Sequence, residues 1–193
     1  MSDEILNPTP EEEEEEEFSY EGFDWKKEIK EWLQAILFAL VIGYFIINFV
    51  FATVRVEGQS MDPTLAHGDR LIVWRLGYEP ENGDIVVLEP PIYNVDDYYV
   101  KRVIATEGQT VQIINNHVYV NGEVLDEPYI QGNVSALDSR YELPQAIPEG
   151  ACFVLGDNRE HSSDSRAFGL VPNDHIMGEV KLRVWPLNSL GVF

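Results

Sequence analysis

Two residues of this sequence, Ser60 and Lys101, are of types that together can carry out nucleophilic catalysis. Ser60 lies two residues after Gly58 and three before Pro63, a spacing typical of a tight turn that can direct a hydroxyl and neighbouring backbone N–H groups into a cleft. A serine in such a turn is far more often only a turn former. It acts as a nucleophile where a neighbouring base takes its proton, so the chemistry depends on finding that base.

Lys101 stands in the apolar run 98–106, which predicts a β-strand. Side chains alternate along a strand, so Lys101 and Arg102 face opposite sides and one of the two cations must leave solvent or lie at an edge. Burial lowers the pKa of a lysine because it disfavours the charged form, and only the neutral amine can accept a serine proton. The strand pattern by itself favours an exposed edge lysine over a buried base.

A third segment, Gly156–Gly169, places many aspartate, arginine and serine residues between two glycines. A polar surface loop is the ordinary interpretation of such a composition. The density of hydrogen-bonding groups directly after an apolar strand also suits a shell that holds catalytic side chains in place.

The histidines and the single cysteine offer no better site. His67, His117 and His175 are expected to be exposed, and only His161 lies beside a motif, so a Ser-His-Asp triad is disfavoured. No spacing typical of metal ligands occurs, and we predict no metal and no cofactor. Cys152 lies in an apolar strand, where we expect a core residue.

The first element that positions these residues is a membrane anchor. The run Trp32–Phe51 holds 20 residues without a charge, a length that matches a helix across a hydrocarbon core of about 30 Å. It is apolar on every face, exceeds the roughly 7–15 residues of a cleaved signal and lacks an Ala-x-Ala exit. We therefore predict an uncleaved single span. Three lysines precede it closely, which favours a cytoplasmic N-terminus: Lys26, Lys27 and Lys30.

The chain divides into three expected parts. Residues 1–25, with seven consecutive glutamates at 11–17, predict a disordered acidic tail. Residues 26–54 predict a juxtamembrane segment and a transmembrane helix that spans about 32–51. Residues 55–193 predict a mainly β, barrel-like catalytic domain, because short β-branched runs alternate with turns and no helical period is sustained. The expected strands are 71–74, 84–88, 98–106, 111–114, 117–120, 152–155 and 178–185.

Charge excludes one class of function. The net charge is −21, of which −10 lies in residues 1–54 (3 − 13) and −11 in residues 55–193 (10 − 21). Both parts are acidic and no basic patch is available to neutralise phosphates, so we expect no nucleic-acid partner.

Over residues 32–193 the chain resembles the bacterial type I signal peptidases, particularly the compact single-span kind. Four motifs follow the span in the family's order: Gly58–Leu65, Gly83–Val87, Lys101–Val103 and Gly156–Gly169. The resemblance implies a membrane-bound serine endopeptidase that removes N-terminal signal peptides from exported preproteins and cuts after small residues. It further implies a single-pass protein of the cell membrane with an extracytoplasmic catalytic domain.

The resemblance also implies roles for individual residues. Ser60 is the nucleophile and Lys101 the general base of a Ser/Lys dyad, and Ser162 orients the lysine. A supporting network consists of Asp157, Asp164 and Arg166. Some members carry a serine at the position of Gly58, whose hydroxyl helps to form the oxyanion hole. With glycine here, we expect the hole to depend on backbone N–H groups, chiefly that of Ser60 and also that of Gly58, with a water as an alternative donor.

We expect a monomer whose partners are preproteins and the lipid bilayer, with Met61 and Leu65 helping the domain rest on lipid. Two alternatives remain. The self-cleaving repressors of the DNA-damage response share the chemistry by resemblance, but they begin with a DNA-binding domain where this chain has a tail and a span. A catalytically silent β module is the other, and the intact set of Ser60, Lys101 and Ser162 argues against it. The mechanism requires Lys101 to be buried, unpaired with a carboxylate and held by Ser162.

Overall fold

The computed structural model describes residues 24–92, 97–133 and 146–193. The expected acidic tail, up to residue 23, lies outside the described residues. The described residues divide into two units, one up to Leu40 and one from Val41 to Phe193.

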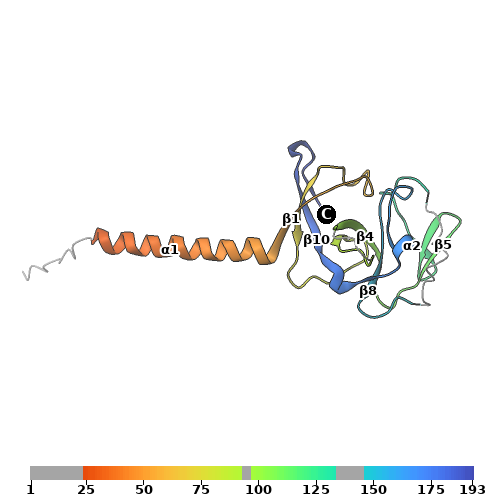
Figure 1. Cartoon of the computed structure of the whole chain (residues 1–193), viewed down its shortest axis with the longest axis horizontal. Coiled ribbons are helices and arrows are strands. Elements are labelled where there is room, and N and C mark those ends of the chain that lie inside the picture. The colour runs from red at the N-terminus through yellow and green to blue at the C-terminus, as the bar shows by residue number, and fades with distance from the viewer. Residues whose placement is uncertain (1–23, 93–96, 134–145) are drawn as a thin grey trace, which may run out of the picture. The chain divides into compact units, whose positions relative to one another are not determined.

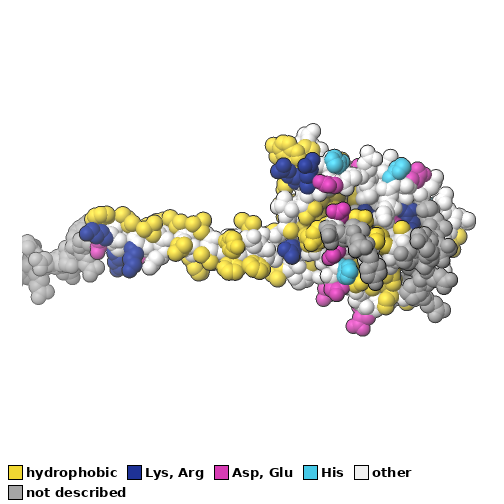
Figure 2. All heavy atoms as spheres, in the orientation of Figure 1, with side chains coloured by type: hydrophobic (Ala, Val, Ile, Leu, Met, Phe, Trp, Pro, Cys, Tyr) yellow, Lys and Arg dark blue, Asp and Glu magenta, His cyan; other side chains and the backbone are white. Residues whose placement is uncertain are grey.

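The N-terminal element is a long apolar helix (Figure 1). α1 runs from Trp25 to Phe45 and continues as a π-helix over Ile46–Val50. The Asp24 carboxylate accepts the backbone N–H of Lys26 at 3.1 Å, which satisfies a free donor of the first turn and starts the helix before the uncharged run. No residue of α1 is buried, and Figure 2 shows hydrophobic side chains along it. In length and composition, Trp25–Val50 is a candidate membrane span.

The second unit is mainly β, as predicted, and its principal sheet curls into a half-barrel (Figure 1). The strand order is β1-β2-β10-β3-β4-β8-β9, with β11 beside β10, and all pairs are antiparallel. The strands are β1 (Phe51–Arg55), β2 (Arg70–Trp74), β3 (Ile85–Leu88), β4 (Tyr99–Ala105), β8 (Ala151–Leu155), β9 (Val171–Pro172), β10 (Ile176–Trp185) and β11 (Gly191–Val192).

A smaller antiparallel sheet follows β4, and the expected strands 111–114 and 117–120 pair in it as a hairpin. Its strands are β5 (Val111–Ile114), β6 (His117–Val120) and β7 (Glu123–Val124). Asn115 and Asn116 form the two-residue turn with φ of 49° and 65°, which asparagine tolerates and which matches the twist of the strands. After β1, the described residues hold helical structure only in short pieces: α2 (Ser165–Phe168) and the 3₁₀ turns Asn173–His175 and Leu187–Ser189.

The core of the half-barrel reaches the turn that carries Ser60. Met61 and Leu65 are 1% and 0% exposed and pack with strand residues such as Val73 and Val87. The expectation that Met61 and Leu65 rest on lipid is therefore wrong, because both side chains face inward. Their burial anchors the turn to the sheet immediately beside Ser60.

Candidate active site

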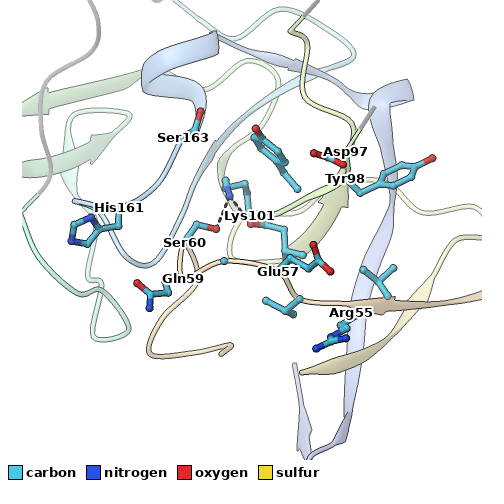
Figure 3. A pocket seen from close by; sticks show the side chains of 14 residues that line it. Arg55, Glu57, Gln59, Ser60, Asp97, Tyr98, Lys101, His161 and Ser163 are labelled. Carbon is cyan, nitrogen blue, oxygen red and sulfur yellow. Dashed lines mark hydrogen bonds between the residues drawn. The ribbon is translucent and has the colours of Figure 1, made fainter. Parts of the chain in front are cut away.

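Ser60 and Lys101 meet at one end of a cleft (Figure 3). Lys101 comes from β4, which pairs with β3 and β8, and Ser60 from the turn after β1. The Lys101 Nζ donates hydrogen bonds to Ser60 Oγ at 2.8 Å and to the carbonyl oxygen of Val100 at 2.9 Å. Two residues 41 positions apart thus have the contact that proton transfer from a serine to a base requires.

The surroundings of Lys101 favour the neutral amine. The residue is 3% exposed, and no carboxylate of the described residues forms an ion pair with it. Burial lowers the pKa of Lys101 from 10.5 to about 8, against the opposing charges of Asp164 and Asp157 and with help from Arg166. The Tyr99 ring lies 5.1 Å from Nζ and offers a face that attracts the cation once it forms.

The neighbouring cation, Arg102, projects from the opposite face of β4 and is also largely removed from solvent. Its guanidinium donates to both carboxylate oxygens of Asp157, from Nε at 2.9 Å and from Nη2 at 2.7 Å. The side chains of Arg102 and Asp157 are 12% and 0% exposed. Thr64 adds a third donor to Asp157 at 2.6 Å, so this carboxylate joins β4, the polar loop and the turn of the nucleophile.

A second carboxylate, Asp164, organises the other end of the polar loop. It caps α2 by accepting the backbone N–H of Arg166, and it accepts Nε and Nη2 of the same arginine, both at 2.8 Å. It also accepts the backbone N–H of Gly156 at 3.0 Å. The buried ion pair between Asp164 and Arg166 and the bond to Gly156 therefore connect the two ends of the polar loop.

Ser162 is brought into this region, but its hydroxyl has no hydrogen-bond partner among the described residues. A Cβ at Gly156 would lie only 2.2 Å from Ser162 Oγ, so glycine is what allows the two segments to approach. The structure thus gives Lys101 two of its three expected properties, burial and the absence of a carboxylate partner. The orienting contact from Ser162 remains a prediction.

The two backbone donors expected in the oxyanion hole differ. The Gly58 N–H donates to His67 Nδ1 at 3.2 Å, and Gly58 has a φ of +94° that only glycine adopts readily. The Ser60 N–H has no partner among the described residues. Of the two, Ser60 therefore has the donor that is available to a developing oxyanion.

The sequence patterns did not single out several residues of this network. Arg159 is 1% exposed, donates from Nε to the carbonyl oxygen of Gly156 at 2.9 Å and forms an ion pair with Glu127. Asn158 contacts the nucleophile's loop through its backbone and side chain. Both residues lie inside the polar loop, so the polar composition of that loop is the sequence feature that could have indicated them. Glu127 lies in a separate loop, where no sequence feature indicated a role for it.

The cleft beside the dyad has a volume of about 430 Å³ and is lined chiefly by residues 54–60 and 97–101. β1 is the last strand of its sheet, so its free edge can take an added strand. His161 also lines the cleft, but Figure 3 shows its ring directed away from Ser60 and Lys101. No group of residues suited to hold a metal ion occurs in the described part of the chain.

Comparisons with known proteins identify the family of this chain. The family model "Signal peptidase, peptidase S26" matches residues 29–185. The chain is 42% identical over 181 residues to signal peptidase IB of Staphylococcus aureus strain COL, covering 85% of this chain and 93% of the relative. It is 38% identical over 175 residues to signal peptidase I of Bacillus licheniformis, covering 86% and 93%.

A solved structure of a signal peptidase I from Enterococcus faecalis V583 is 31% identical and covers 53% of this chain and 97% of that one, with a TM-score of 0.46. The family match extends over most of the apolar helix, the turn of Ser60, β4 and the polar loop. The chain belongs to the signal peptidase family, peptidase S26, and is a serine endopeptidase.

Proposed function

We propose that this protein removes N-terminal signal peptides from exported preproteins through a Ser60/Lys101 dyad and cuts after small residues. The observation that carries the proposal is the 2.8 Å contact between Lys101 Nζ and Ser60 Oγ in a buried setting that favours the neutral amine. The relatives named signal peptidase supply the substrate class.

The reaction follows from the proton that the lysine takes. Neutral Lys101 accepts the hydroxyl proton as Ser60 Oγ bonds to the scissile carbonyl carbon. The carbonyl oxygen gains negative charge, which the Ser60 N–H stabilises. The C–N bond then breaks, protonated Lys101 gives its proton to the leaving amine, and an acyl-enzyme remains. Water activated by the same lysine hydrolyses the ester and regenerates Ser60.

The cleft supports an extended substrate. Its lining includes the free edge of β1 and the apolar side chains of Val54, Val56 and Val100. A preprotein segment added beside such an edge uses backbone hydrogen bonds for affinity and alternate side chains for selection. We infer that small residues at the first and third positions before the cut fit against this wall.

The apolar helix supports action at a membrane. A single span at Trp25–Val50 holds the enzyme in the bilayer that also holds the hydrophobic region of its substrate, which raises their effective concentration. We propose a cytoplasmic N-terminus, an extracytoplasmic catalytic domain and a monomeric enzyme.

The test uses the full-length protein in detergent with a preprotein that carries Ala-x-Ala before the cut. Mass spectrometry of the products should show one cleavage directly after the second alanine. Replacing that alanine by leucine should abolish the cut, and Ser60→Ala should reduce turnover to background. Cleavage at unrelated positions, or unchanged activity of Ser60→Ala, would contradict the proposal.

A further inference from the structure

Asn158 holds the C-terminal end of the loop Gly58–Ser60. The backbone N–H of Asn158 donates to the carbonyl oxygen of Ser60, and its side-chain Nδ2 donates to that of Gln59, both at 3.0 Å. Asn158 is 5% exposed, so its amide has little access to water. A single buried residue therefore fixes the carbonyl groups of Gln59 and Ser60, one on each side of the Ser60 Cα atom.

His67 holds the N-terminal end of the same loop, at Gly58. Its Nδ1 accepts the Gly58 N–H at 3.2 Å, which requires this nitrogen to be unprotonated. The backbone around His67 is fixed in turn, since Val56 N–H donates to the carbonyl of Asp69 and Gly68 N–H to that of Val56, each at 2.9 Å. The hydrogen bond from Gly58 to the imidazole thus lies next to the two backbone hydrogen bonds of Val56, at the point where Gly58 turns the chain.

The turn itself supplies little restraint at this point. A Cβ at Gly58 would meet no atom within 4 Å, so neither a side chain nor close packing holds this glycine. Rotation of its peptide would reorient the following residues, including the N–H of Ser60. Because oxyanion stabilisation depends on donors oriented before the reaction, such rotation would lower the rate of the chemical step.

We propose that Asn158 and His67 are positioning residues that hold the two ends of the loop Gly58–Ser60, so that the Ser60 N–H faces the substrate carbonyl. The proposal rests on the proposed function, in which Ser60 is the nucleophile. Neither side chain hydrogen-bonds to Ser60 Oγ or Lys101 Nζ, so both act through the backbone of the loop.

For His67, the informative pair is His67→Ala and His67→Asn. The Oδ1 of asparagine can lie close to the place of Nδ1 and accept the Gly58 N–H, whereas alanine cannot. Since His67 is exposed, water can partly replace its nitrogen, and we expect His67→Ala to lower kcat about three- to tenfold with KM within about twofold. His67→Asn should recover kcat to within about twofold of the wild type.

For Asn158, we test Asn158→Ala, which removes the donor to Gln59 and leaves the backbone contact to Ser60. Asn158 is buried and its contact with Gln59 is partly buried, whereas the contact of His67 is exposed, so we expect a larger loss in kcat, about ten- to thirtyfold. The controls are His117→Ala on the hairpin and Asn188→Ala on the C-terminal turn, both exposed and outside the cleft. Each should keep the wild-type kcat.

The assay is preprotein cleavage by the full-length protein in detergent, with kcat, KM and Tm measured for every variant and Ser60→Ala included. Loss of kcat in both alanine variants, with recovery by His67→Asn, supports the proposal. Wild-type kcat in the two alanine variants overturns it while an inactive Ser60→Ala leaves the proposed function intact. Failure of His67→Asn to recover activity overturns the role of His67, and an active Ser60→Ala overturns the proposed function.

Discussion

At the scale of residues, the feature that matters most is an amine kept uncharged by burial. A lysine with its ordinary pKa of 10.5 is neutral in about one molecule in 3,000 at pH 7, whereas a pKa of about 8 makes roughly one in ten available. The fraction of Lys101 that is neutral at pH 7 is therefore about 300 times higher than for an ordinary lysine. Arg102, the next residue of the same strand, pairs with Asp157 and stays charged. Burial therefore favours the neutral form of Lys101, whereas the ion pair favours the charged form of Arg102.

The lowered pKa of Lys101 predicts how activity depends on pH. Catalysis needs the deprotonated amine, so activity is lost as pH falls below the folded-state pKa and is retained above it. We expect kcat/KM to rise about tenfold per pH unit between 6 and 7 and to level off above about 8. Initial rates of preprotein cleavage across this range check it, and a flat profile from pH 6 to 8 would be incompatible with Lys101 as the base.

Ser162 provides a second prediction at this scale. Its buried hydroxyl has no partner among the described residues, so Ser162→Ala removes no hydrogen bond that stabilises the fold. If Ser162 orients Lys101 during the reaction, kcat should fall about ten- to a hundredfold while Tm stays unchanged or rises. The neighbouring exposed Ser163→Ala is the matched control. Equal activity of the two variants would remove Ser162 from the mechanism.

At the scale of elements, the polar loop after β8 connects the parts that carry the dyad. Asp157 pairs with Arg102 of β4 and accepts a bond from Thr64 of the nucleophile's turn. Asp164 and Arg166 close the same loop around Gly156. Ser60 and Lys101 therefore share one support, and a change in that support should affect fold and activity together.

The Asp157–Arg102 pair allows a test of this support. Asp157→Ala would leave a largely buried guanidinium without its carboxylate, which typically costs about 3–5 kcal/mol, or roughly 10 °C in Tm for a domain of this size. Lys181→Ala, which removes an ion pair whose lysine side chain is 45% exposed, should cost less than about 1 kcal/mol. Thermal unfolding in detergent compares them, and similar losses would contradict a supporting role for Asp157.

Much of the element pattern could be predicted from local sequence. The expected strands at 71–74, 84–88 and 111–120 form within a residue or two, because β-branched runs and turn residues encode them locally. β1 was harder, since Phe51–Arg55 continues the apolar run of the helix and is separated from it only by pairing with β2. β7, β9 and β11 have two residues each and leave no periodic signal.

The site was less accessible to local reasoning. Alternation along β4 separated Lys101 from Arg102 but could not say which would be buried, because that depends on what packs against each face. The contact with Ser60 depends on the curl of the sheet, and the contacts of Asn158 and His67 depend on two loops meeting. Such long-range contacts have no periodic signature, and the resemblance of ordered motifs supplied what the pattern could not.

At the scale of the whole molecule, the chain joins a candidate span to a β-rich protease. α1 and the π-helical segment end at Val50, and β1 begins at the next residue. The join has no linker, so the strand at the edge of the cleft starts where the helix ends.

The proposed orientation can be tested with protease added to intact spheroplasts. An epitope at the N-terminus should be protected until the membrane is permeabilised, whereas an epitope at the C-terminus should be lost at once. Three lysines precede the span, and converting Lys26, Lys27 and Lys30 to glutamine should reduce the fraction in this orientation. Protection of the C-terminal epitope in intact spheroplasts would reverse the proposed topology.

If Lys101 is the base, the Lys101→Met variant should be folded but inactive. Methionine has nearly the same length and suits a buried position, so the fold should persist with a Tm close to that of the wild type. The measurement is the rate of preprotein cleavage by the full-length protein in detergent from pH 7 to 9. We expect no cleavage above background at any of these pH values, and a folded Lys101→Met variant with activity within tenfold of the wild type would contradict the role of Lys101 as the base.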